Sequence, residues 1–87
     1  MLEHEIYDVI IARMKEILKE RIVGKIFIIK GDTDIYIWIQ HPRFGTFRYT
    51  IYDVDKIDWN ELSSTTFASL IINWHKNSLL KTAFLSK

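Results

Sequence analysis

The sequence predicts a single α+β domain in the order helix, three antiparallel strands, helix. Near both ends of the 87-residue chain, apolar residues recur at three- and four-residue spacing, as they do along amphipathic helices. Between these ends, three short segments alternate apolar and polar residues and are separated by compact turns, as in antiparallel strands. A chain of this length accommodates one domain, which we expect to span residues 1–87.

The first helix is expected from Leu2 to about Glu20. Acidic residues occupy its first turns and Lys19 and Arg21 follow at its end, an order that the helix dipole favours. Its apolar stripe, widened by Tyr7 and Ile11, consists of Ile6, Val9, Ile10, Met14, Ile17 and Leu18.

Three strands are expected over residues 22–30, 35–40 and 46–52, where β-branched and aromatic residues alternate with polar ones. The four residues 31–34 and the five residues 41–45 contain Gly, Asp and Pro and form the turns. If these turns pair Lys30 with Ile35 and Gln40 with Thr46, the apolar residues of all three strands share one face. A one-residue slip would break that agreement, so we predict a meander with both helices packed mainly on this isoleucine face.

The second helix is expected after an acidic connector over residues 53–61. Ser63 to Thr66 offers several candidates for its N-cap. Its apolar stripe consists of Phe67, Leu70, Ile71 and Trp74, continued by Leu79, Leu80, Ala83 and Phe84. The polar run Lys76-Asn77-Ser78 weakens this stripe, which leaves a bend or break open at that point.

Enzyme chemistry is not expected. Nucleophilic catalysis needs a nucleophile, a base and an orienting group in one pocket. The chain has no cysteine, its serines all lie at or in the second helix, and His4, His41 and His75 fall on three different elements. Three glycines form no phosphate-binding or dinucleotide-binding motif. We therefore predict no catalytic residue and no cofactor.

The acidic connector resembles a run of metal ligands only superficially. A calcium loop would need an oxygen ligand where Ile57 stands and a glycine where Asp58 stands. We expect these carboxylates to form turns and to lie near the start of the second helix, with no metal site.

The cytoplasm is the expected location. The first five residues are acidic where a secretory signal would be basic, and no apolar run reaches the ~18 residues of a membrane span. The absence of cysteine fits a reducing compartment. We therefore expect no membrane partner.

The second face of the sheet carries the candidate binding residues. The predicted register places Phe27 beside Trp38 and Arg48, and Ile29 beside Tyr36. A solvated sheet face is usually polar, and an apolar patch there indicates a covering element or a partner. Arg48 is expected to stack on Trp38 in a cation–π contact. The predicted partner-binding residues are Phe27, Ile29, Tyr36, Trp38, Arg48 and Tyr52, with Arg43 and Phe44 of the hairpin tip as secondary candidates.

Three interpretations of this face remain open. The second helix, or its part after Asn77, crosses over and covers it; a homodimer buries two such faces; or another protein docks on it. From a different class, a nucleic-acid-binding module would use the aromatic rings as stacking platforms. The nearly balanced net charge of +1 and the acidic residues at the ends of the sheet disfavour a nucleic acid.

The layout of the chain resembles small accessory proteins of phages and prophages of low-GC Gram-positive bacteria. The resemblance lies in the short first helix, the isoleucine-rich hairpins, the segment Tyr52-Asp53-Val54-Asp55-Lys56-Ile57-Asp58-Trp59-Asn60-Glu61-Leu62-Ser63-Ser64 and the closing helix. Fifteen isoleucines against three alanines fit the coding bias of such genomes. The resemblance implies a non-enzymatic protein that binds a host protein in the host cytoplasm, such as an inhibitor of a host defence or nucleic-acid-processing protein.

Overall fold

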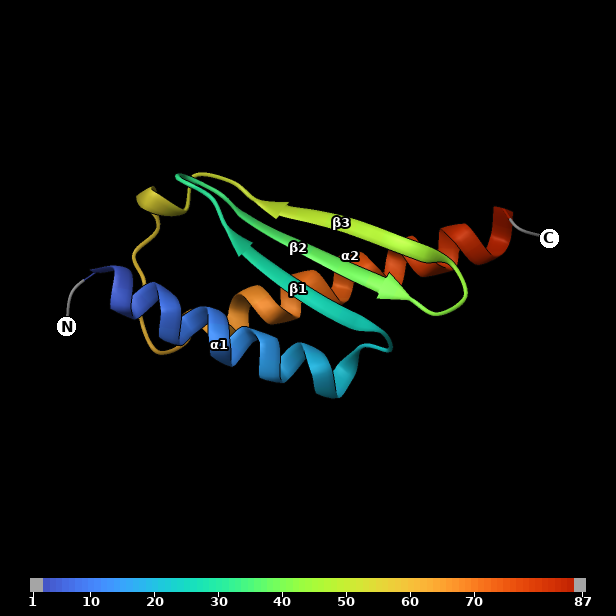
Figure 1. Ribbon diagram of the computed structural model, residues 1–87, viewed down its shortest axis with the longest axis horizontal. Coiled ribbons are helices and arrows are strands. Elements are labelled where there is room, and N and C mark those ends of the chain that lie inside the picture. Colours follow the sequence, from blue (N-terminus) through green and yellow to red (C-terminus); the bar gives the residue numbers. More distant parts are fainter. Residues whose placement is uncertain (1–2, 86–87) are drawn as a thin grey trace.

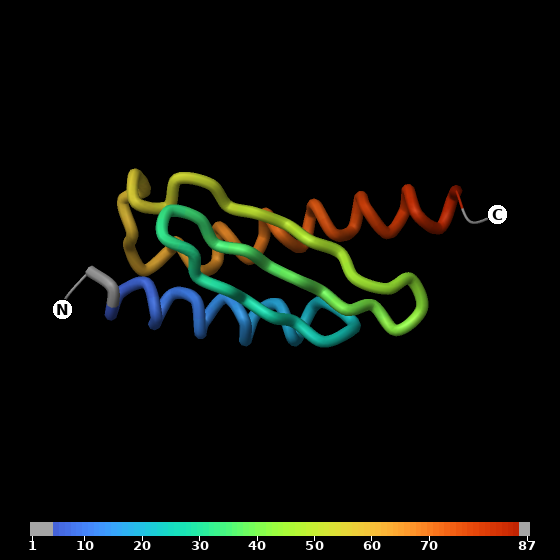
Figure 2. The backbone as a smooth tube through the Cα atoms, turned by 45° about the horizontal axis from the view of Figure 1, so that its top comes forward, coloured from blue at the N-terminus to red at the C-terminus, as the bar shows by residue number. Residues whose placement is uncertain are grey.

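The computed structural model of the protein describes residues 3–85, with side chains from residue 5 onward. The elements in chain order are α1 (Glu3–Arg21), β1 (Lys25–Lys30), β2 (Ile35–His41), β3 (Gly45–Ile51), the short 3₁₀ helix η1 (Val54–Lys56) and α2 (Ser63–Leu85). Both helices lie against the same face of the three-stranded sheet (Figures 1 and 2). The predicted α+β fold is confirmed.

The sheet is an antiparallel meander in the order β1-β2-β3, with the predicted register. Lys30 pairs with Ile35 across the first turn, and Gln40 pairs with Thr46 across the second. The isoleucine face therefore carries the predicted set, which consists of Ile26, Ile28, Ile35, Ile37, Ile39, Phe47, Tyr49 and Ile51.

The first strand begins at Lys25, three residues later than predicted. Ile22 still belongs to the end of α1, because its N–H donates to the Leu18 carbonyl at 2.8 Å. Gly24 then reverses the chain with a φ of 122°, and a Cβ at this position would overlap the carbonyl of Gln40. The close approach requires glycine, and it sets α1 directly beneath the start of the sheet.

The core lies between the isoleucine face and the two helices. Met14 and Leu18 of α1, Ile71 of α2, and Ile37 and Ile39 of β2 are fully buried. The other buried members of this core are Ile10, Ile22, Ile26, Ile35, Ile51, Val54 and Ala68. Helices and sheet thus bury their apolar sides against each other, which is the basis of a two-layer domain.

One member of the predicted stripe of α1 is displaced from the core. Tyr7, expected only at the margin, is buried together with Ile10, Met14 and Leu18 at spacings of three and four residues. Val9 falls on the flank of this arc, where it is 56% exposed and lines a shallow hollow with Leu62.

The connector between β3 and α2 is held by a tryptophan that the sequence pattern did not single out. Trp59 Nε1 donates to the Val54 carbonyl at 2.9 Å, and the Trp59 ring packs against those of Tyr7 and Phe67 at centroid distances of 4.7 and 5.2 Å. Asp53, at a φ of 54°, donates its N–H to Asp34 Oδ1 at 3.0 Å. In the described part of the chain, no three acidic or histidine side chains gather as a metal-binding group.

The hydrogen bonds at the start of α2 join Asn60, three residues before the helix, to Leu62 and to Ser63. Asn60 Oδ1 accepts the Leu62 N–H at 2.9 Å, and Ser63 Oγ accepts the Asn60 N–H at 2.9 Å. These two hydrogen bonds satisfy the backbone N–H groups of Asn60 and Leu62, which have no partner within the helix. Ser63, inside the segment predicted to hold the cap, thus takes part in the hydrogen bonds at the helix start, and both Ser63 and Ser64 are buried.

α2 is continuous through residues 76–78, the point at which the sequence pattern allows either a bend or a break. Ser78 Oγ donates to the Trp74 carbonyl at 3.0 Å, so the polar run is absorbed within the helix. Its 23 residues make a helix of about 34 Å, whereas a strand of seven residues spans about 23 Å. The last turns of α2 therefore project past the sheet (Figure 1), and Leu80 and Phe84, expected to continue the core stripe, are 62% and 77% exposed.

Candidate partner-binding face

The sheet face opposite the helices is open to solvent. We call it the aromatic face, and it consists of Phe27, Ile29, Tyr36, Trp38 and Arg48, with Tyr52 directly after β3. Phe27, Ile29 and Trp38 are 42%, 44% and 37% exposed. Since α2 packs on the isoleucine face along its buried residues, the interpretation in which the second helix covers the aromatic face is wrong.

Two rows of side chains cross the three strands as predicted. Phe27 lies opposite Trp38, which lies opposite Arg48, and the next row joins Ile29, Tyr36 and Thr50. The Arg48 guanidinium carbon is 5.1 Å from the centroid of the Trp38 ring, which confirms the expected cation–π contact. At an exposed site such a contact is worth about 0.5–1 kcal/mol.

A shallow depression of about 310 Å³ lies over the β1 side of the aromatic face. Phe27, Ile29 and Trp38 contribute apolar walls, and Lys15 reaches the depression from α1. The strand residues of this face include two charged side chains, Arg48 and Lys25, both cationic. The face is therefore apolar at its centre and positive at its margin.

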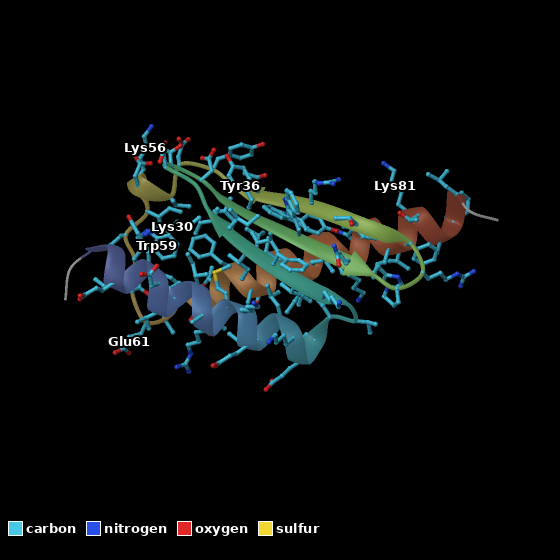
Figure 3. The ribbon with its side chains drawn as sticks, viewed as in Figure 1. Lys30, Tyr36, Lys56, Trp59, Glu61 and Lys81 are labelled. Atoms are coloured by element: carbon cyan, nitrogen blue, oxygen red, sulfur yellow. The ribbon has the colours of Figure 1, made fainter. Side chains whose placement is uncertain are left out.

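Tyr36 and Tyr52 lie near the β1–β2 turn. A Cβ on Gly31 would come within 2.9 Å of the Tyr36 ring, which shows how closely this ring lies over the turn. The Tyr36 hydroxyl donates to Asp34 Oδ2 at 3.5 Å, a long hydrogen bond. Figure 3 shows Tyr36 on the sheet at the end of the molecule that is opposite to Lys81. Tyr52 is 70% exposed. The two phenols thus mark a more polar end of the aromatic face.

The hairpin tip does not extend the aromatic face. His41 Nδ1 accepts the backbone N–H groups of Arg43 and Phe44 at 3.0 and 3.2 Å, which closes the tip. The half-buried Phe44 ring stacks on His41 at 5.0 Å, and the Arg43 guanidinium lies 5.0 Å from the Phe44 ring. His41 in turn contacts Phe47, on the isoleucine side of the sheet. Arg43 and Phe44 are thus separate from the other candidates.

A buried polar pair links α2 to β3 and was missed by the sequence pattern. Tyr49 Oη and His75 Nδ1 are 2.8 Å apart, His75 is 2% exposed, and its Nε2 has no hydrogen-bond partner among the described residues. Burial lowers the pKa of His75 below its ordinary value, with repulsion from His41 as the smaller cause. Burial also raises the pKa of Tyr49, against a smaller opposing effect of a hydrogen bond with Ser78.

The signal for this pair was present but ambiguous. Tyr49 occupies an inward strand position, and His75 lies four residues after Ile71 on the buried side of α2. Neither fact alone indicates that the two meet, because they are 26 residues apart.

No protein-family model, curated protein or solved structure shows significant similarity to this chain. Among the helices described, none combines the length and apolar character needed to cross a membrane.

Proposed function

We propose that the protein is a non-enzymatic binding protein that docks a partner protein on its aromatic face. The observation that carries this proposal is the exposure of Phe27, Ile29 and Trp38 on adjacent strands, each more than a third accessible. Contiguous apolar patches on small domains usually accompany an interaction site. Aromatic and arginine side chains are also the residue types that contribute most to binding at interfaces.

The charges of the face define the partner's chemistry. Arg48 and Lys25 lie within the strand rows and Lys15 lines the depression. A complementary surface would present apolar side chains to Trp38 and Phe27 and carboxylates around them, because like charges across an interface cost affinity. The partner surface is therefore apolar where it meets Trp38 and Phe27 and acidic where it meets Arg48, Lys25 and Lys15, away from Asp34 at the other end of the face.

The resemblance to phage accessory proteins supports a role as an inhibitor of a host defence or nucleic-acid-processing protein in the host cytoplasm. A small inhibitor acts by covering a functional surface, for which a rigid scaffold and one exposed patch are sufficient. The buried isoleucine core provides the scaffold and the aromatic face provides the patch.

The test is a pull-down from the lysate of a low-GC Gram-positive bacterium, with and without nuclease. The baits are the wild type, Trp38→Ala and the control Val23→Ala, which removes an apolar side chain that is 68% exposed in the α1–β1 loop. We expect one acidic protein that survives nuclease treatment, is lost with Trp38→Ala and is kept with Val23→Ala.

Two results would contradict the proposal. A folded wild-type bait that retains nothing specific would identify the aromatic face as something other than a docking surface. Recovery that disappears with nuclease would indicate a nucleic acid stacked on Trp38, and its affinity should then fall steeply with salt.

A further inference from the structure

A hollow of about 440 Å³ lies between the end of α1, the end of β2 and the second half of α2. α1 ends beneath the sheet, whereas α2 continues beyond it, so the two helices do not cover the same length of the sheet (Figure 1). The apolar part of the wall includes Ile22, Ile72, Leu79 and Leu80. This volume and this apolar wall are typical of sites that bind small molecules.

Four side chains of the wall are basic, and we call the site the basic hollow. They are Arg21, His41, His75 and Lys76, and no acidic residue is among the described residues that line the hollow. The carbonyl groups at the end of α1 offset part of the charge of Arg21. His41 Nδ1 accepts two backbone N–H groups, which leaves the hydrogen of its neutral ring on Nε2. Arg21, Lys76 and His41 are therefore all hydrogen-bond donors.

His75 adds a buried nitrogen to this wall. Its Nδ1 is 2.8 Å from Tyr49 Oη, and a phenol is a stronger acid than a neutral imidazole, so the hydroxyl donates and the ring hydrogen lies on Nε2. Nε2 has no hydrogen-bond partner among the described residues.

The direction of Nε2 follows from its ring. The two nitrogens of an imidazole direct their hydrogen bonds to nearly opposite sides. Since Nδ1 of His75 faces Tyr49 on β3, Nε2 is directed away from β3, toward the side of the sheet where α1 packs beside β1. The basic hollow lies on that side, so an acceptor bound in it would complete the hydrogen bonding of His75.

We propose that the basic hollow binds a small carboxylate with an apolar body. The carboxylate accepts a hydrogen bond from His75 Nε2 and is attracted by Lys76, while the apolar body packs against Leu79 and Leu80. The same groups would repel a cation, and a purely apolar ligand would leave Nε2 without an acceptor. Because Nε2 is buried, the carboxylate reaches it when a side chain of the wall changes rotamer, as the 62% exposed Leu80 does readily.

This inference does not rest on the proposed function. The basic hollow lies on the side of the sheet that carries the helices, and the aromatic face is the opposite side. A failed pull-down would leave the carboxylate site untouched, and a basic hollow that binds no carboxylate would leave the docking proposal untouched.

The probe for this site is octanoate, and the measurement is proton–nitrogen correlation NMR of the intact chain. We expect octanoate to shift the backbone signals of Ile22, His41 and Lys76 in a saturable manner, with a dissociation constant in the millimolar range because the hollow is open. Acetate lacks the apolar body and octylammonium has the opposite charge, so each should bind at least ~10-fold more weakly. Equal binding of octanoate and octylammonium, or shifts centred on Trp38, would overturn the proposal.

Two matched pairs of variants on α2 locate the site. Lys76→Glu reverses a charge of the wall, and Lys81→Glu makes the same change outside it; Leu80→Ser and Phe84→Ser form the apolar pair in the same way. All four side chains are exposed, so the variants should fold like the wild type. We expect Lys76→Glu and Leu80→Ser to weaken octanoate about 3–10-fold and their controls to leave it unchanged. Equal affinities within either pair would contradict the site.

His75→Phe tests the buried nitrogen, because it keeps a ring and removes Nε2. Octanoate should bind at least ~3-fold more weakly to this variant, whose folding is checked by its thermal unfolding. In the wild type, octanoate should also shift the proton signal of His75 Nε2. Unchanged affinity in a folded His75→Phe would exclude His75 from the site and overturn the proposal.

Discussion

The two faces of the sheet are built from the same three strands, yet one is closed and the other open. On the isoleucine face, Ile35, Ile37 and Ile39 are at most 1% exposed, whereas on the aromatic face Phe27, Ile29 and Trp38 are 37–44% exposed. Both faces are apolar enough to attract a helix. The difference lies in their charges: covering the aromatic face would bury Arg48 and Lys25, and burying unpaired charge costs far more than the apolar contact returns.

Whether a sheet face stays open to solvent depends on its apolar content and also on the charged groups that a covering element would bury. Against the isoleucine face, the buried Tyr49 and His75 are paired with each other, and Tyr49 also has a hydrogen bond with Ser78. The aromatic face has cationic groups that water solvates well, so an apolar partner must bring carboxylates with it.

The largest expected effect comes from truncating a buried residue of β2, and its neighbour on the opposite face is the comparison. Ile37→Ala removes a fully buried side chain and should lower the free energy of unfolding by about 2–4 kcal/mol. Trp38→Ala, one residue along, should lower it by about 1 kcal/mol or less, because its ring is already in contact with water. Urea denaturation of both variants measures the difference, and equal losses would show that the aromatic face is as buried as the core.

The next largest effect is expected at Gly24, where the chain turns from α1 into β1 and α1 is placed against the isoleucine face. Gly24→Ala forces a Cβ into the Gln40 carbonyl at a positive φ and should cost about 2 kcal/mol or more. Gly45→Ala is the matched control, because it has a φ of 84° but an open space around the added Cβ, and it should cost about 1 kcal/mol. Thermal unfolding distinguishes the two, and a larger loss in Gly45→Ala would contradict the close packing at Gly24.

A pH effect probes the buried contact between Tyr49 of β3 and His75 of α2. The pKa of His75 is lowered in the folded state, so between that pKa and the ordinary value of about 6.5 the unfolded chain binds more protons than the folded one. His75 therefore makes its full contribution to the free energy of unfolding above about pH 6.5. This contribution is lost as the pH falls from there through the lowered pKa of His75 in the folded state.

His75→Phe keeps a ring in this place and removes the titrating group. It should flatten the fall in stability below about pH 6.5, as measured by denaturation at several pH values. Unchanged pH dependence in His75→Phe would assign the effect to other groups.

The smallest effect on stability is expected for Arg48→Ala. The cation–π contact with Trp38 is exposed, so the free energy of unfolding should fall by about 0.5–1 kcal/mol. Affinity for a docked acidic partner should fall much more, because a charge that faces carboxylates is removed. Titration calorimetry with the captured partner compares Arg48→Ala with Val23→Ala, and equal affinities would remove Arg48 from the binding surface.

The register of the sheet follows from the sequence alone. Alternation along three segments and turns of four and five residues leave one pairing in which the isoleucines of all strands share a face, and a slip by one residue would turn them to solvent. The aromatic face follows from the same parity, so the sequence alone predicts its residues. The alternation of side chains between the two faces of a strand depends only on neighbours in the sequence, so a local sequence pattern predicts it.

Contacts between distant residues were decided only in the tertiary structure. The sequence pattern left open whether α2 would bend, and its continuous helix keeps it on the isoleucine face and leaves Leu80 and Phe84 beyond the sheet. The meeting of Tyr49 with His75, and the packing of Trp59 on Tyr7, join elements whose relative placement no local period encodes. Element type and register depend on neighbours along the chain, whereas these contacts depend on how long, straight elements cross in space.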